Sequence, residues 1–403
     1  MIRRKHIGWT SLLVLLFTVS CRPPSEDGGQ ETRDIQILNL DAPLKISFDE
    51  LVDSVSYIAL DPKNHLIGDV VTIKRDDDLL FVQERKRLYA FSISGKFISE
   101  IGAVGNSSRE HHYIQTFFLD KTQKHVNIVT YGKLLEFSYD GTFISSIPLP
   151  ESSGSIAEMA CYSPDSLIVC NTLPNKVDVR LAEYVLLSNN SGQLKETRLL
   201  DGIKNESQDI SYSFPYHPMV KVENRIYAVS ALSDTVYAYA GGNEMSPAFR
   251  VPIPNLAPSA AYLREHEDID FFTLRDKLNE KGFGLGITDI AAVDGNFILS
   301  VNKCQTVITD GKEGVVIDSD VYDKNTDSYA LCLFTGGISE EYMGYLEVGF
   351  LLKEKTKKHI MNGDCPQLKK LIETLSAEDN PVVFQYHFKK DLIEILKKKL
   401  AQQ

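Results

Sequence analysis

A few pairs and clusters of polar residues could carry chemistry in this sequence. His111 and His112 could serve in acid–base catalysis or bind a metal, and Asp76-Asp77-Asp78 could hold a cation. Neighbouring residues of a strand point to opposite faces, however, so the two histidines are poorly placed to share one ion. The aspartates are better explained as a polar turn between two strands. We therefore expect neither a metal nor another cofactor.

The common catalytic and cofactor-binding motifs are absent from the sequence. It contains no P-loop, GxSxG, HExxH or EF-hand spacing. The five cysteines beyond residue 21 are odd in number and form no CxxC pair, which favours buried thiols over a metal site or a disulfide framework. A net charge of −12 argues against a nucleic-acid partner.

A repeated hairpin organises the middle of the chain. Residues 91–101 read FSISGKFISEI, and residues 137–147 read FSYDGTFISSI. In both copies, apolar and polar residues alternate on either side of a Ser-Gly or Asp-Gly pair, which predicts two strands joined by a tight turn. Weaker copies follow around Gly192 and Gly242. Repeats of this length that consist only of strands are typical of propeller blades.

The sequence predicts an all-β fold, a six-bladed β-propeller of four-stranded antiparallel blades, in a single domain over residues 35–403. Five blades are expected at about 66–102, 113–149, 156–200, 217–253 and 286–335. Helical insertions are expected at about 258–281 and 351–376, and a short helix at the C-terminus. The strand at 54–60 has no hairpin partner nearby, and the last blade, about 345–388, is short of a strand. We expect the first to complete the second and close the ring.

The N-terminus predicts export and a lipid anchor. Residues 1–20 have the basic start and short apolar core of a signal peptide. They end in Thr18-Val19-Ser20-Cys21, which resembles a bacterial lipobox, so Cys21 is the expected site of lipidation and the contact with the membrane. Residues 21–34 form a flexible tether by composition. A secreted protein without lipid is the alternative, and the outer membrane, facing either the periplasm or the outside, is the expected location.

Several segments resemble the six-bladed β-propeller lipoproteins of Bacteroidetes, which are NHL- or TolB-like propellers of largely unassigned function. The segments are Val55–Leu60, Ile101–Glu110, Ser233–Tyr237 and Asn380–Val382. Ser107-Ser108-Arg109 departs from the Gly-Pro-Gly usual in that family. The resemblance implies the fold and brings no catalytic residues with it.

A ligand is expected on one face of the propeller. The connections from each outer strand to the next inner strand all cross the same face, and loops on a rigid scaffold often carry function. Nine charged or aromatic residues lie on these connections and form the predicted ligand site: Glu110, His112, Tyr216, His217, Arg109, His111, Tyr212, Arg264 and Glu265.

Two functions from different classes fit these features. The first is a non-enzymatic module that binds a protein or glycan ligand on the loop face. The alternative is a hydrolase or lyase that acts on glycans or peptides in the central channel. Three or more acids and histidines that converge on the channel would favour the enzyme, whereas an apolar or tyrosine-lined mouth would favour the binding module.

Overall fold

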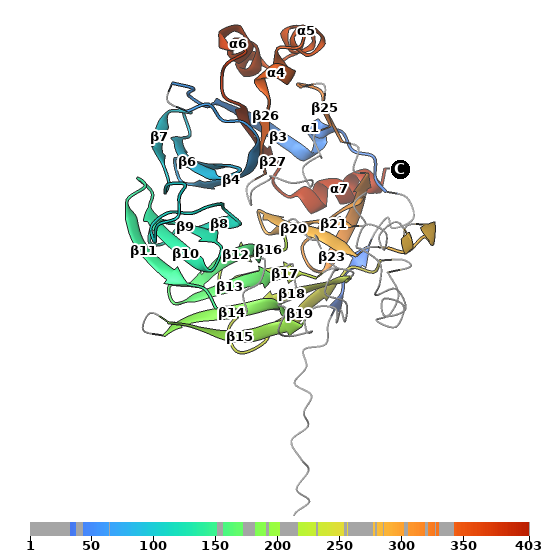
Figure 1. Cartoon of the computed structure of the whole chain (residues 1–403). Coiled ribbons are helices and arrows are strands. Elements are labelled where there is room, and N and C mark those ends of the chain that lie inside the picture. The colour runs from blue at the N-terminus through green and yellow to red at the C-terminus, as the bar shows by residue number, and fades with distance from the viewer. Residues whose placement is uncertain are drawn as a thin grey trace, which may run out of the picture. The chain divides into compact units, whose positions relative to one another are not determined.

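Six β-sheets are arranged as blades around a central axis in this computed structural model, which confirms the predicted six-bladed propeller (Figure 1). The structure describes residues 33–37, 43–63, 65–150, 156–171, 182–190, 193–201, 217–230, 233–253, 256, 277–278, 280–284, 286–301, 305–318, 321–326, 328–329 and 342–402. Residues 32–403 form one compact unit.

Blades 1 to 3 are regular four-stranded antiparallel sheets in which spatial order follows chain order. Blade 1 contains β4 (Val70–Asp76), β5 (Leu79–Glu84), β6 (Arg87–Ser92) and β7 (Phe97–Glu100). Blade 2 contains β8 (Thr116–Asp120), β9 (His125–Thr130), β10 (Lys133–Ser138) and β11 (Phe143–Pro148). Blade 3 contains β12 (Ile156–Ser163), β13 (Ser166–Asn171), β14 (Ala182–Asn190) and β15 (Gln193–Asp201). The first strand of each blade contacts the first strand of the next, so these inner strands surround the axis.

Blades 4 and 5 each carry an additional fifth strand from the N-terminal segment. Blade 4 contains β16 (Met219–Val222), β17 (Arg225–Val229), β18 (Thr235–Tyr239) and β19 (Ser246–Arg250), and blade 5 contains β20 (Ile287–Val293), β21 (Asn296–Val301), β22 (Gln305–Thr309) and β23 (Glu313–Asp318). β1 (Arg33–Asp34) pairs with β19, and β2 (Gln36–Ile37) pairs with β23, both in parallel. The sequence did not predict these strands, because each has only two residues and only Ile35 between them is buried. A hairpin of β24 (Tyr322–Asp323) and β25 (Ser328–Tyr329) follows blade 5.

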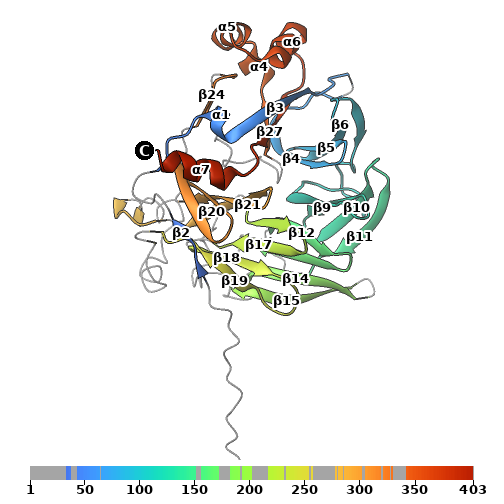
Figure 2. The same cartoon turned by 180° about the vertical axis from the view of Figure 1, so that it is seen from behind.

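Blade 6 joins the two ends of the chain and confirms the predicted closure of the ring. Its strands are β26 (Met343–Leu346), β27 (Val382–Phe388) and β3 (Val52–Ala59), with the short helix α1 (Phe48–Leu51) leading into β3. β27 pairs on one edge with β26 and on the other with β3, where Phe384 lies opposite Tyr57. Both views of the cartoon show the N-terminal strand β3 beside the C-terminal strand β27 (Figures 1 and 2).

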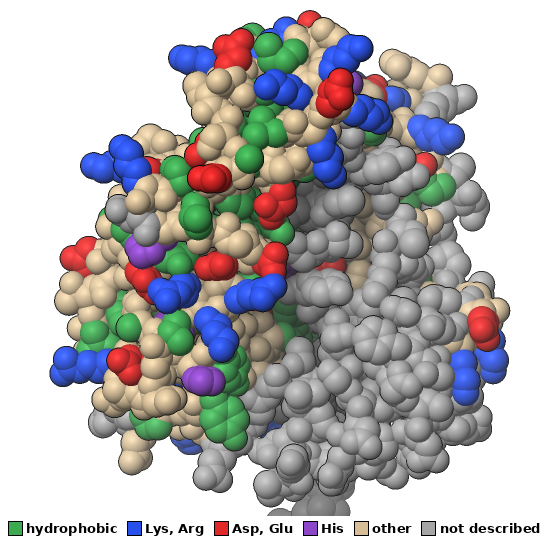
Figure 3. All heavy atoms as spheres, turned by 45° about the horizontal axis from the view of Figure 1, so that its top comes forward, with side chains coloured by type: hydrophobic (Ala, Val, Ile, Leu, Met, Phe, Trp, Pro, Cys, Tyr) green, Lys and Arg blue, Asp and Glu red, His purple; other side chains and the backbone are tan. Residues whose placement is uncertain are grey.

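Three helices stand outside blade 6, as the sequence predicts for residues 351–376. They are α4 (Val348–Leu351), α5 (Glu354–Asn362) and α6 (Pro366–Thr374), and their buried leucines and isoleucines pack against Tyr57 and Val382. Lys and Arg side chains gather over this helical layer (Figure 3). The predicted C-terminal helix is α7 (Leu392–Leu400). The insertion expected at 258–281 lies mostly outside the described residues, but Lys277, Leu278 and Glu280 are helical.

The turn glycines Gly95 and Gly141 pack blades 1 and 2 each onto the blade before it. Gly95 and Gly141 adopt positive φ angles of 82° and 89°, which glycine tolerates best. A Cβ atom on Gly95 would collide with the backbone oxygen of Ala59 in β3, and one on Gly141 would lie 2.8 Å from the backbone oxygen of Glu100 in β7. In addition, Asp61 donates its backbone N–H to the oxygen of Gly95 at 2.8 Å. The repeat therefore encodes a contact between blades as well as a hairpin.

We predict that Gly95→Ala destabilises the propeller far more than Gly132→Ala. Both glycines have positive φ angles, but a Cβ on Gly132 would meet no atom within 4 Å. Gly132→Ala should cost only the left-handed strain of about 1–2 kcal/mol, whereas Gly95→Ala adds a backbone clash at the closing strand and should cost about 3 kcal/mol or more. Urea unfolding of both variants measures the difference. Equal losses in the free energy of unfolding would show that the turn at Gly95 is not in close contact with β3.

Candidate functional site

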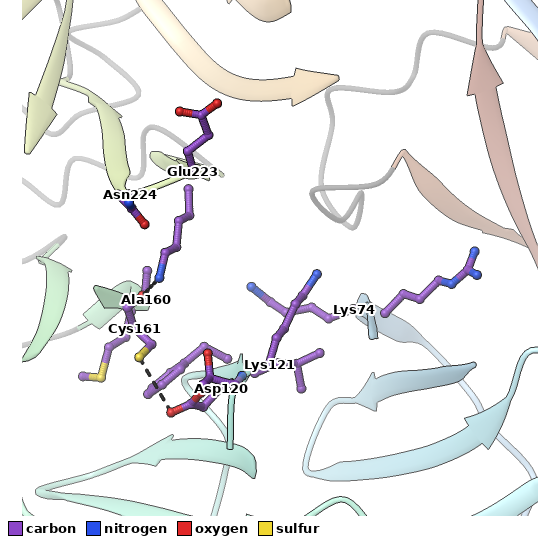
Figure 4. Close-up of a pocket in the computed structure, with 13 residues that line it drawn as sticks. Lys74, Asp120, Lys121, Ala160, Cys161, Glu223 and Asn224 are labelled. Carbon is purple, nitrogen blue, oxygen red and sulfur yellow. Dashed lines mark hydrogen bonds between the residues drawn. The ribbon is translucent and has the colours of Figure 1, made fainter. Parts of the chain in front are cut away.

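A pocket of about 420 Å³ lies at one end of the central channel and is lined by four blades. Its walls come from the inner strands β4, β8, β12 and β16 and the turns after β8 and β16. Figure 4 shows Lys74 and Lys121 pointing into the opening between the blades, with Glu223 on the opposite side. Charged and polar lining residues are Lys74, Arg75, Asp120, Lys121, Thr122, Lys221, Glu223 and Asn224, and the apolar wall includes Phe118, Leu119, Met159, Ala160 and Cys161.

The blade repeat explains why charged residues ring this end of the channel. The inner strands of blades 1 to 5 run to the same end of the channel, and each stops there at a tight turn to the second strand of its blade. Such turns favour polar residues with left-handed backbone, and Asp77, Lys124 and Glu223 have positive φ angles at these places. Five short turns therefore bring polar side chains together around one opening. We call this opening the turn-side mouth.

Two cations of the mouth donate hydrogen bonds to uncharged oxygen atoms. Lys221 donates from Nζ to the backbone oxygens of Cys161 and Tyr162 at 2.9 and 3.2 Å. Arg75 donates from Nη1 to Oε1 of Gln385 at 2.7 Å and from Nε to the backbone oxygen of Asp77 at 2.9 Å. These contacts fix the directions of both side chains. Each cation thereby also ties its own blade to a neighbouring one.

Asp120 and Cys161 form a small polar contact on the pocket wall. Asp120 accepts the backbone N–H groups of Thr122 and Gln123 through Oδ1, both at 3.0 Å, so it shapes its own turn. The thiol of Cys161 donates to Oδ2 of Asp120 at 3.8 Å. Burial, and then the negative charge of Asp120, raise the pKa of Cys161 to about 11. The thiol is therefore protonated near neutral pH and is a poor nucleophile.

An ion pair lies in the channel beyond the pocket wall. Lys74 of blade 1 and Glu158 of blade 3 lie 3.6 Å apart, with 15% and 10% of their side chains exposed. Lys74 also lies 5.8 Å from the ring centroid of Phe117 in blade 2, so this pair spans three blades. Glu158 follows a bulge at the start of β12, and Asp289 follows an equivalent bulge in β20. Bulges of this kind change where a side chain points, here on strands beside the axis.

His217 links blade 4 to blade 5 at the start of the inner strand β16. Its backbone N–H donates to Oδ1 of Asp289 at 2.9 Å, and its backbone oxygen accepts from Ile290 at 3.1 Å. Its ring atom Nε2 is shielded from solvent and has no hydrogen-bond partner among the described residues. Burial, and then the positive charge of Lys74, lower the pKa of His217 to about 4. The imidazole is therefore neutral at physiological pH.

The four neighbouring site candidates, residues 109–112, lie together in the loop between blades 1 and 2. Glu110 accepts the backbone N–H of Ser107 at 2.9 Å, which lowers its pKa. His111 is buried and contacts the backbone oxygen of Lys86 through Nε2 at 2.8 Å, and burial lowers its pKa. Arg109 lies over the ring of Phe143 with its guanidinium 5.2 Å from the centroid, and His112 is exposed. Most of this loop therefore serves its own packing.

The predicted site residues and the turn-side mouth lie at opposite ends of the inner strands. The loop of residues 109–112 and His217 precede inner strands, whereas the mouth forms where these strands end. No described contact joins the loop to His217. Tyr212, Tyr216, Arg264 and Glu265 lie outside the described residues, as does Cys21. Ligand binding by these residues stays a prediction.

Sequence reasoning missed the mouth because none of its residues stands out along the chain. Lys74 and Lys221 lie within ordinary strands, Lys121 follows one, and Cys161 reads as a buried strand thiol. The sequence did contain a signal: charged residues recur near the C-terminal end of the inner strands of successive blades.

A second, more open pocket of about 410 Å³ lies beside α5 and is lined by residues that include Lys355, Lys358 and Asp364. This pocket is lined by α5, by the residues that follow it and by the turn between β24 and β25, and none of the inner strands lines it.

The described parts of the chain contain neither a cluster of metal-binding side chains nor a membrane-spanning helix. No three His, Cys, Asp or Glu side chains gather there as a metal-binding group. No helix described here is long and apolar enough to cross a membrane.

Comparison with known proteins shows the family of this chain. Residues 33–387 match the family described as "Domain of unknown function (DUF4934)", and the chain belongs to that family. A crystal structure of a candidate exported protein from Bacteroides fragilis is similar, with a TM-score of 0.64 and 18% identity over 89% of this chain and 100% of that one. A DUF4221 family member from Bacteroides vulgatus has a TM-score of 0.48 and 9% identity over 84% of this chain and 98% of that one. No curated protein matches the sequence.

We predict that His217 makes the propeller less stable in mild acid. The folded state protonates His217 only near pH 4, whereas the unfolded chain takes up this proton near pH 6.5. Stability should therefore fall as the pH drops from about 6.5 to about 4, by at most about 3 kcal/mol from this residue. His217→Gln removes the titrating group, so its urea midpoint should fall less over this range. A variant profile parallel to that of the wild type would contradict the assignment.

Proposed function

We propose that this protein is an exported lipoprotein, anchored through Cys21, whose propeller binds a ligand at the turn-side mouth without catalysing a reaction. The pocket at the channel end is the observation that carries the proposal. The signal peptide and lipobox support export and anchoring to the outer membrane. The family match and the likeness to a candidate exported protein from Bacteroides fragilis agree with an exported propeller.

The shape and composition of the mouth suit a small ligand or one end of a larger one. Its volume of about 420 Å³ falls in the usual range for ligand pockets. The inner strands of four blades form its walls, so the site is rigid before a ligand arrives. The apolar wall of Phe118, Leu119 and Met159 can cover the carbon skeleton of a ligand, while the charged residues orient it. A protein or a glycan can present a side chain or a terminal sugar that combines a carbon skeleton with polar groups.

The described residues of the mouth favour binding over catalysis. Cys161 stays protonated, Asp120 is engaged in its turn, and Glu158 is paired with Lys74. A hydrolase or lyase acting on glycans or peptides is the second candidate, because Glu158, Asp289 and His217 approach the channel from three blades. Loss of turnover of a glycan or peptide in Glu158→Gln would support that candidate. The binding proposal expects no turnover in either form.

We predict that the mature protein begins at a lipid-modified Cys21. Mass spectrometry of the protein from native membranes should find a diacyl or triacyl cysteine as the first residue. Cys21→Ser should leave an unmodified chain that fractionates differently, because no other lipid anchor is expected. A wild-type N-terminus at another residue, without lipid, would overturn the anchoring proposal while leaving the pocket unaffected.

We predict that a bulky residue in the mouth abolishes ligand binding. Native mass spectrometry against a panel of neutral and charged oligosaccharides and peptides should find a ligand of the wild type. Ala160→Trp, on the pocket wall, and Thr122→Trp, at its rim, should each reduce binding at least about tenfold, because the indole occupies the space of the ligand. Ile144→Trp places the same side chain on the exposed surface of β11 and should bind normally. Unchanged binding by both pocket variants, with normal melting, would overturn the proposal.

A further inference from the structure

We propose that the side of the propeller opposite the turn-side mouth contacts the surface of a lipid bilayer through exposed apolar side chains of blades 1 and 2. We call it the loop side, because the connections between blades cross it. The inference rests on the proposed anchoring through Cys21 and adds how the propeller is oriented, with its pocket facing away from the membrane. Four exposed residues form the contact, and we call them the apolar tips: Leu66, Val71, Val104 and Tyr131.

All four apolar tips lie on the loop side by their place along the strands. Leu66 belongs to the connection from β3 to β4, and Val71 is the second residue of β4. Val104 follows β7, and Tyr131 lies in the turn between β9 and β10. The inner strands β4 and β8 begin on the loop side and end at the mouth, and β9 returns antiparallel to β8. The turn after β9 is therefore on the loop side as well.

Hydrogen bonds join the segments that carry the tips. The first ties the connection from β3 to the end of β5, the second ties the turn after β5 to the loop after β7, and the third ties this loop to the start of β10. They run from the backbone N–H of Gly68 to Oε1 of Glu84 (3.0 Å), between Nε2 of His111 and the backbone oxygen of Lys86 (2.8 Å), and from Nζ of Lys133 to the backbone oxygen of Ser107 (2.9 Å). The tips therefore lie on adjoining segments of one surface, unlike the single exposed apolar residues that are normal on proteins.

The local backbone turns these side chains outward. Tyr131 is 82% exposed and precedes Gly132, whose positive φ angle of 70° forms a tight turn. A Cβ atom on Gly132 would meet no atom within 4 Å, so this turn projects from the fold. Val71 is the extra residue of a bulge at the start of β4, and bulges of this kind change where a side chain points. It is 45% exposed although β4 is an inner strand, and Leu66 before it is 66% exposed.

Apolar contact, and not charge, is the attraction that this surface offers. Arg85 forms an ion pair with Asp69, and Arg87 forms one with Glu100 at 2.6 Å, so oppositely charged side chains lie side by side here. The whole chain carries a net charge of −12, which disfavours an anionic surface. Aliphatic side chains gain free energy when they leave water, and a tyrosine suits the bilayer interface, where its ring is buried and its hydroxyl reaches water.

The anchor and the form of the surface favour a bilayer over a protein partner. The chain between Cys21 and Arg33 reaches at most about 40 Å when fully extended, so a lipid on Cys21 would keep the propeller beside the membrane. At the resulting high effective concentration, a weak apolar contact is sufficient. A stable protein interface usually buries about 800 Å² per partner around packed pockets, whereas a fluid bilayer accepts separate tips without a matching groove.

This contact would set the direction in which the pocket faces. β4 runs from the loop side to the mouth over seven residues, roughly 20 Å at the usual rise of a strand. A propeller that contacts the bilayer with its loop side therefore keeps the turn-side mouth away from the lipid headgroups. The pocket is then open to a ligand that arrives from solution.

Tryptophan reporters in the mature chain test the contact. Residues 22–403 contain no tryptophan, so an introduced one is a unique fluorophore. An N-terminal hexahistidine tag recruits this chain to phosphatidylcholine vesicles that contain a nickel-chelating lipid, and the tag takes the place of the natural anchor. Brominated acyl chains should quench the indole of Tyr131→Trp. They should not quench that of Thr122→Trp, in the mouth, or that of Ile144→Trp, on the outer strand β11.

Removal of the other tips should weaken the contact. Leu66→Ser combined with Val104→Ser, in the Tyr131→Trp chain, should lower the ratio of docked to undocked protein by about tenfold, because two aliphatic side chains no longer leave water. Ile98→Ser combined with Ile144→Ser removes isoleucines that are 41% and 42% exposed on outer strands, and it should leave the quenching unchanged. Added salt should have little effect, because the contact is apolar. Thermal melting of each variant confirms folding.

The possible outcomes separate this inference from the proposed function. Absence of quenching in Tyr131→Trp, or equal quenching in Thr122→Trp, would overturn the orientation on the bilayer. Quenching that persists in the Leu66→Ser and Val104→Ser chain would overturn the role of the tips. Light scattering that shows a dimer lost in this double variant, without quenching, would assign the surface to a second copy of the chain and overturn the bilayer. Because the tag replaces the lipid, an unmodified native N-terminus would overturn only the anchor, and the ligand panel alone decides the pocket.

Discussion

The pairing of β27 with β3 is the contact on which the rest of this propeller depends. It joins residues that are more than three hundred positions apart, from Ala59 opposite Val382 to Val52 opposite Phe388. Unpaired strand edges are exposed to solvent and to other chains, so an open ring would leave blade 6 with a free edge. Closure also brings β26 against β4, so that blade 6 contacts blade 1 through their inner strands. A channel, and therefore a mouth, exists only because the two ends of the chain pair.

The contact that joins blade 6 to blade 1 recurs between blade 1 and blade 2. The turn of Gly95 in blade 1 rests on the backbone of Ala59 in β3, and the turn of Gly141 in blade 2 rests on Glu100 in β7. β3 therefore meets blade 1 as the outer strand β7 meets blade 2. Apolar side chains such as Phe81, Phe117 and Phe137 fill the space between these blades. The N-terminal strand thus replaces the outer strand that a C-terminal blade would otherwise supply.

The sequence predicted the architecture well because the architecture is local and repeated. Each hairpin is encoded by alternating residues around a turn glycine, and the lone strand at 54–60 could be assigned to blade 6 from its lack of a partner. The additional strands β1 and β2 escaped prediction because two residues carry no periodicity. The pocket could not be predicted from the sequence for a different reason. Lys74 and Glu158 lie 84 positions apart, and only the curvature of the closed ring brings them within 3.6 Å.

The Lys74–Glu158 pair is itself an argument that the channel has a use. Removing two charges from water costs several kcal/mol per ion, and their attraction repays this only in part, so apolar residues of similar size would often stabilise a fold as well or better. The pair is nearly buried, and burial of one member alone would be costlier still. A structure that only needed to fill its axis would gain by apolar side chains such as Met159 and Phe118, which already line the neighbouring wall. Retention of this ion pair beside an apolar wall is accounted for when the channel must meet a polar ligand.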